Sequence, residues 1–136
     1  MLLGLAEVAA AQGVVIARVT PAAVVEALKG ELLPQGFQMV HSDEKGALFA
    51  LDRGMVQQQG TSGPVGGSVV HIVLEFSVRF KQKEESLQVT AREEVVGNPR
   101  SSIQFRKPVE SQAERNNMQR LLESIRDSLE ARRDST

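Results

Sequence analysis

The stretch Val69-Val-His-Ile-Val-Leu-Glu-Phe-Ser-Val-Arg-Phe80 is followed by a charged turn and then by Leu87-Gln-Val-Thr-Ala-Arg-Glu-Glu-Val-Val96. In both stretches apolar residues alternate with mostly polar ones. The alternating apolar residues are Val70, Ile72, Leu74, Phe76, Val78 and Phe80, then Leu87, Val89, Ala91 and Val95. Because successive side chains of a strand point to opposite faces, this period of two predicts a long antiparallel hairpin with one buried face.

A strand and a helix are expected before this hairpin. The run from Val14 to Val19 is short and apolar, which is typical of a buried strand. Thr20-Pro21 predicts a helix start, since Thr can cap free backbone amides and Pro fits the first helical position. Apolar residues then recur at helical spacing, at Val24, Val25, Leu28, Leu32 and Leu33. Pro34 should end the helix, and Gly36 allows the chain to reverse.

A second, shorter hairpin is expected from residues 37–41 and 47–52. The intervening Asp43-Glu-Lys-Gly46 is rich in turn-forming residues, and we expect Gly46 to adopt a positive φ. Four apolar side chains should share the inner face of this hairpin: Phe37, Met39, Phe49 and Leu51.

Two further elements are expected after the long hairpin. Gly97-Asn-Pro-Arg100 predicts a turn, and residues 101–107 predict a last strand with Ile103 and Phe105 facing inward. Residues 110–132 have the pattern of a long amphipathic helix, whose apolar stripe is Met118, Leu121, Leu122, Ile125 and Leu129. The order β-α-β-β-β-β-β-α predicts an α+β fold, in which an antiparallel sheet of five to six strands packs against an N-terminal helix and a long C-terminal helix.

Length and composition limit the domain count and the class of function. The chain of 136 residues suits a single domain, which we place at residues 14–132; residues 1–13 are either a signal remnant or a short helix. With 16 basic and 17 acidic residues and no Trp or Tyr, the sequence argues against nucleic-acid binding. The absence of Cys excludes disulfides, zinc–thiolate sites and cysteine nucleophiles. No apolar stretch reaches the length of a transmembrane helix.

Residues 53–68 break the periodicity and hold five of the eleven glycines. A loop of this length in a small domain is usually functional or disordered. Its apolar residues are Met55, Val56 and Val65, and we expect them to contact a ligand or a partner. The segment lacks the Gly-Lys-Ser/Thr of a phosphate-binding loop, and Ser62 lacks the surroundings of a hydrolase nucleophile. We therefore expect a flexible connector or a gate.

Metal sites and acid–base catalysis need clustered histidines and carboxylates, and the sequence pattern predicts none. The histidines are His41 and His71, and His71 falls on the polar face of its strand beside Glu75. We interpret this as a solvated pair, and we expect no metal, no cofactor and no catalytic residue.

The pairing of the long hairpin places one carboxylate on its apolar face. If Val78 pairs with Val89, the numbers of paired residues add to 167, so that Glu75 faces Arg92 on the polar side. The same register directs Glu93 to the helix side of the sheet, where a carboxylate costs free energy unless it is paired or protonated.

Two kinds of role are open for Glu93. It is either a pocket acid that anchors a ligand, or a structural residue for which the fold avoids or offsets the cost of burying a carboxylate. A β-bulge could turn the side chain outward, or an ion pair with Arg115 or Arg120 could compensate its charge.

The order of elements resembles the helix-grip arrangement, in which a curved antiparallel sheet holds a long C-terminal helix. It also resembles small α+β domains of bacterial envelope lipoproteins. These have a strand-helix-strand start with a Gly-Phe step, as at Gly36-Phe37, and a closing Leu-Leu-rich helix, as at Leu121-Leu122. The resemblance covers residues 14–130 and implies a protein of the periplasm or cell envelope without catalysis. The lipobox cysteine of such lipoproteins is absent.

Three hypotheses of function follow. The first is a non-enzymatic, envelope-type domain that binds a protein or surface partner. The second is a carrier of a small apolar ligand, held between the sheet and the C-terminal helix and gated by residues 53–68. The third is an enzyme that uses Glu93 or His71. A cavity under the helix would favour the carrier, whereas a filled interior with an exposed apolar patch would favour the partner-binding domain.

Overall fold

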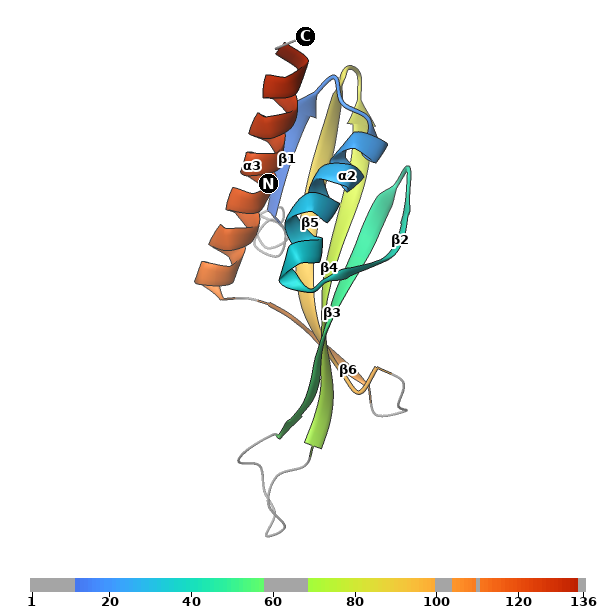
Figure 1. Cartoon of the computed structure of the whole chain (residues 1–136), viewed down its shortest axis with the longest axis vertical. Coiled ribbons are helices and arrows are strands. Elements are labelled where there is room, and N and C mark those ends of the chain that lie inside the picture. The colour runs from blue at the N-terminus through green and yellow to red at the C-terminus, as the bar shows by residue number, and fades with distance from the viewer. Residues whose placement is uncertain (1–11, 58–68, 100–103, 110, 135–136) are drawn as a thin grey trace, which may run out of the picture.

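The computed structural model describes residues 12–57, 69–99, 104–109 and 111–134. The elements are β1 (Gln12–Ala17), α2 (Pro21–Leu32), the 3-10 turn η1 (Leu33–Gln35), β2 (Gln38–Asp43), β3 (Gly46–Gln57), β4 (Val69–Lys83), β5 (Ser86–Gly97), β6 (Phe105–Pro108) and α3 (Gln112–Asp134). This order confirms the predicted α+β fold. Both helices pack on the same face of one antiparallel sheet (Figure 1).

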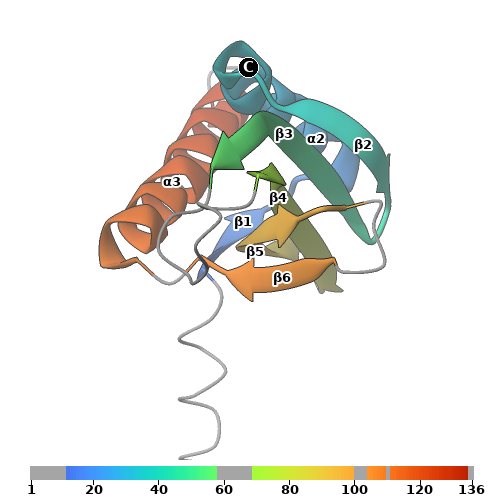
Figure 2. The ribbon, with the colours of Figure 1, turned by 90° about the horizontal axis from the view of Figure 1, so that it is seen from below.

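The six-stranded sheet has the order β1-β5-β4-β3-β2, and β6 adds to the free side of β5. β1 pairs with residues 86–91 of β5, whereas β6 pairs with residues 94–97. The two short strands therefore share one edge of β5. Seen from below, β6 lies alongside β5 (Figure 2).

The core lies between the sheet and the two helices. Its fully buried members come from both layers and include Ile16, Leu28, Phe49, Leu87, Val89 and Leu122. The predicted stripe of α3 is confirmed, since Met118, Leu122 and Ile125 are buried and Leu121 and Leu129 pack against the cluster. The predicted start of α2 is confirmed as well, because the Ala23 amide donates to the Thr20 hydroxyl over 3.1 Å. Gly36 reverses the chain after η1 with a φ of 104°.

Two details of the short hairpin differ from expectation. The predicted positive φ at Gly46 is wrong; the residue must be small because a Cβ there would clash with the backbone carbonyl of Val78 on β4. The turn is instead held by the Asp43 carboxylate, which accepts from the amides of Lys45 and Gly46. Met39 is 37% exposed rather than inward, because β2 is an edge strand with a register shift just after this residue.

The predicted register of the long hairpin is wrong by two residues. Phe80, not Val78, pairs with Val89, and Glu75 faces Glu94 instead of Arg92. The turn at residues 84–85 lies one position later than assumed, and contacts outside the hairpin hold it: the Arg18 amide donates to the Glu85 carbonyl over 2.7 Å. Since a shift of two residues preserves which face each side chain occupies, Glu93 still points to the helix side.

The expectation of a loop from residue 53 is also wrong, because β3 continues to Gln57. A register shift at Arg53 and a φ of 77° at Gly54 bend the strand without ending it. Within the described residues, the strand ladder at residues 55–57 and 69–71 joins only these two segments, and we call this two-stranded extension the arm. In Figure 1 it projects past the helices. Residues 58–68, with Ser62 and Val65, lie outside the described residues, as does Ile103.

Side chains of α3 cover the outer edge of β1. The Gln119 amide imitates a neighbouring strand: its Nε2 donates to the Gly13 carbonyl over 3.0 Å, and its Oε1 accepts from the Gly13 amide over 3.2 Å. Glu130 likewise accepts from the Ala17 amide. These bonds occupy backbone groups that could otherwise pair with another strand. Neither helix in the described ranges has the length and apolar content needed to cross a membrane.

Candidate functional site

A groove of about 300 Å3 opens where the C-terminal end of α2 meets the N-terminal part of α3 above the sheet. It brings together residues from five elements and the connection before β2. The lining residues are Leu32, Gln35, Phe37, Phe76, Glu93, Glu114, Asn117, Met118 and Leu121. The groove therefore combines apolar walls with two carboxylates and two amides.

Glu93 is half-buried in this groove, directly opposite Phe76 on β4. Burial is the main cause that raises the pKa of the Glu93 carboxyl above its ordinary value of 4.5, and the nearby Glu114 raises it further. Glu114 lies in the first turn of α3, where the helix dipole favours a negative charge. The two carboxylates therefore form a negative site against an apolar wall.

Neither structural explanation of Glu93 from the sequence holds. The pairing of β4 with β5 runs through Glu93 without a register shift, so no bulge turns the side chain outward. Within the described residues, no ion pair joins Glu93 to Arg115 or Arg120. Its carboxylate has no hydrogen-bond partner there either, and only its backbone carbonyl accepts, from the Val109 amide. The carboxylate therefore remains available to a ligand or to water.

The apolar wall of the groove is fixed by aromatic packing. The rings of Phe37 and Phe76 meet edge to face, with centroids 6.4 Å apart, and both residues are buried. Such contacts hold rings in one orientation and add to the stability from burial alone. The groove is consequently built from parts of the core and not from surface loops.

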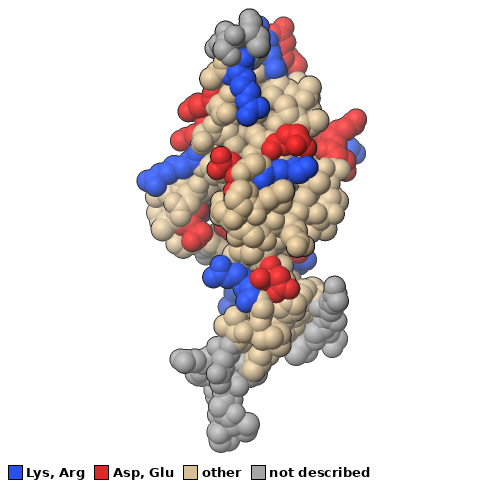
Figure 3. Space-filling model, in the orientation of Figure 1, with Lys and Arg blue, Asp and Glu red and all other residues tan. Residues whose placement is uncertain are grey.

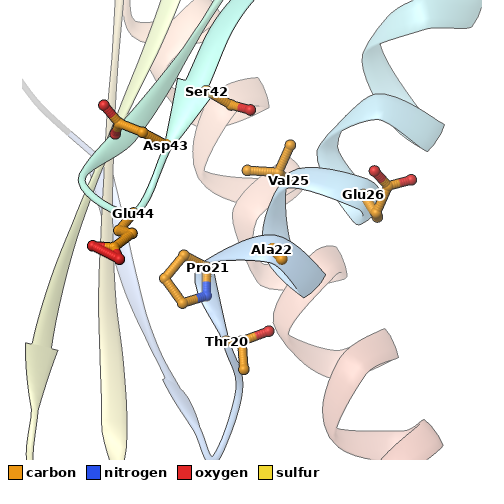
Figure 4. Close-up of a pocket in the computed structure, with 8 residues that line it drawn as sticks. All are labelled: Thr20, Pro21, Ala22, Val25, Glu26, Ser42, Asp43 and Glu44. Carbon is orange, nitrogen blue, oxygen red and sulfur yellow. The ribbon is translucent and has the colours of Figure 1, made fainter.

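A second groove, of about 330 Å3, lies between the first turn of α2 and the β2–β3 turn (Figure 4). Its polar groups already have local structural roles. Thr20 caps α2, and Asp43 accepts from the two turn amides. Glu26 forms an ion pair with Lys29 over 3.3 Å. Of the polar lining side chains, those of Ser42 and Glu44 have no partner within the described residues.

His71 has a different partner from the one predicted. Its Nε2 lies 2.9 Å from the Asp52 carboxylate, whereas Glu75 accepts from Arg106 on β6 over 2.8 Å. The backbone of His71 exchanges hydrogen bonds with Asn98 in the turn after β5. His71 therefore contributes to the base of the arm. In the parts of the chain that the structure describes, no three His, Asp or Glu side chains gather as a metal site.

The arm carries two of the other predicted contact residues, Met55 and Val56. Met55 is 66% exposed, and Val69 lies diagonally across from it on the same face, 55% exposed. Val56 is exposed on the opposite face, where it pairs with the buried Val70. Val65 is outside the described residues. The structure thus separates the predicted contact set into an apolar arm and a groove around Glu93.

Sequence reasoning missed Glu114 as a groove residue. The signal was present, because Glu114 lies four and seven residues before Met118 and Leu121, on the same helical face. What the pattern could not show was that the start of α3 meets β5 at Glu93. No family model matches the sequence, and a search of curated proteins finds no match.

Proposed function

We propose that this protein is a non-enzymatic binding domain of cell-envelope type that contacts another protein through its arm. The observation that supports this proposal is the pair of exposed apolar side chains, Met55 and Val69, placed diagonally on one face of a two-stranded extension. Contiguous exposed apolar surface is a feature of protein interaction sites. The envelope setting is supported by the resemblance in element order alone.

The arm is suited to present a contact surface. Its backbone is hydrogen-bonded between β3 and β4, so its apolar side chains are held in place before a partner arrives. Methionine adapts its shape to an apolar partner surface. Figure 3 shows basic and acidic side chains interspersed over the upper part of the molecule. Towards the arm there is one small group of charged side chains, and the surface below that group is uncharged. Burial of apolar area, and not a charged field, would then dominate binding.

Photo-crosslinking tests this proposal. A photoreactive phenylalanine analogue replaces Met55 in one variant and Val69 in another, and Leu33 in a control variant. Leu33 is 42% exposed but lies at the end of α2, away from the arm. We expect a discrete adduct from both arm positions, and none of that mass from Leu33. The same adduct from all three positions, or none from the arm, would contradict arm-mediated binding.

The carrier hypothesis stays as the second candidate because of the groove beside Glu93. The interior beneath α3 is filled, since Ile16, Val89 and Leu122 have essentially no exposed surface. A ligand would therefore occupy the groove at the end of the helix layer and not a cavity under α3. Residues 53–57 belong to β3, so this part of the expected gate is a strand. Native mass spectrometry of the purified protein would detect a retained ligand.

A further inference from the structure

We propose that the groove beside Glu93 binds small molecules that join a cationic amine to an apolar chain, such as primary alkylamines. The inference rests on the carrier function proposed above and adds the chemical class of the ligand. It is independent of binding through the arm, because Glu93 pairs with Phe76, five residues along β4 from the last residue of the arm.

The charge of the groove selects a cation. Among the described residues that line it, the charged ones are Glu93 of β5 and Glu114 of α3, whose carboxylates face a common space. Glu93 is half-buried, and no described residue donates a hydrogen bond to its carboxylate. Two neighbouring carboxylates need hydrogen-bond donors and a compensating positive charge. An ammonium group supplies both, with three N–H donors. A carboxylate or phosphate ligand would meet repulsion at the same point.

The apolar walls select the rest of the ligand. Phe37 and Phe76 form one rigid side, and Met118 and Leu121 of α3 form another. An alkyl chain lying between them would lose contact with water, which is the general driving force for filling an apolar groove. The side-chain amides of Gln35 and Asn117 remain at the groove as further polar groups.

The size of the groove favours a small molecule as the occupant. Ligand pockets usually measure about 300–1,000 Å3, and this one, at about 300 Å3, is at the lower limit. A short alkyl chain with one amine suits this volume better than a folded partner or a large cofactor would.

Titration with three probes of equal chain length tests the inference. Octylamine, octanol and octanoate are added separately to the 15N-labelled full chain, and binding is followed by NMR shifts of backbone amides. We expect octylamine to shift the amides of Phe76, Glu93 and Met118, and octanoate to shift none of them. The variant Glu93→Gln keeps the shape of the side chain but loses its charge, and it should weaken octylamine binding about tenfold or more.

Two further variants serve as a control and as an independent test of the site. Glu26→Gln removes a carboxylate from the other groove and should leave octylamine binding unchanged. Glu114→Gln tests the same site independently if Glu93→Gln fails to fold, and it should also weaken binding. Equal binding of octanol and octylamine, or unchanged binding in both groove variants, would overturn the cationic preference while the carrier function stands. Absence of binding by all three probes would overturn both.

Discussion

Replacing Leu122 by Ala tests whether α3 is part of the core. Leu122 is 1% exposed and belongs to the cluster that joins both helices to the sheet. The change removes three buried carbon atoms, which costs about 2.4 kcal/mol at about 0.8 kcal/mol for each. The cavity left behind adds to this, so we expect a total loss of about 3–4 kcal/mol, within the range of about 2–5 kcal/mol for such changes.

This loss is a large part of the ~5–15 kcal/mol that stabilises a typical domain. At about 4 °C for each kcal/mol, the melting midpoint should fall by roughly 12–16 °C. Circular dichroism during thermal and urea unfolding measures both quantities. Leu33→Ala is the matched control: Leu33 is 42% exposed, so its loss should cost no more than about 1 kcal/mol. An unchanged midpoint for Leu122→Ala would refute the packing argument and show that α3 is peripheral.

Three other changes should be equally informative. Because burial raises the pKa of Glu93, the ionised carboxylate destabilises the fold. Glu93→Gln should therefore raise the melting midpoint at pH 7. This gain should vanish below about pH 4.5, where the carboxyl is protonated in both the folded and the unfolded chain. Arg106→Ala leaves the two glutamates that it bridges, Glu75 and Glu94, facing each other. Urea unfolding should therefore show a loss of about 1 kcal/mol that shrinks in high salt, unlike the exposed control Arg79→Ala. Gly97→Ala would place a Cβ against the ring of Phe105 and should lower the free energy of unfolding by about 1–3 kcal/mol. The loss should be clearly smaller in a Phe105→Ala background. Equal losses in both backgrounds would exclude the ring as the cause.

Contacts close in sequence could be predicted because short-range geometry decides them. Thr20-Pro21 starts α2 with the expected cap, and the stripe around Leu122 faces the core. The alternation in β4 and β5 determined which face each side chain occupies, including Glu93. That assignment survived a wrong register, since a shift of two residues leaves every side chain on its face.

Contacts between distant segments were decided only by the tertiary structure. The partner of Glu75 depends on β6, whose Arg106 lies 31 residues away, and on a turn held by Arg18. Met39 is exposed because β2 became an edge strand, which depends on how the whole sheet orders.

The candidate site shows the same division between sequence and structure. The alternation of apolar and polar residues in β5 was enough to predict that the Glu93 carboxylate lies on the helix side of the sheet. Its neighbours in the groove come from α2, β4 and α3, which meet there only after the helices pack on the sheet. Local propensity determines the elements and their faces, whereas packing between distant elements determines which faces meet, and the groove exists only at that second level.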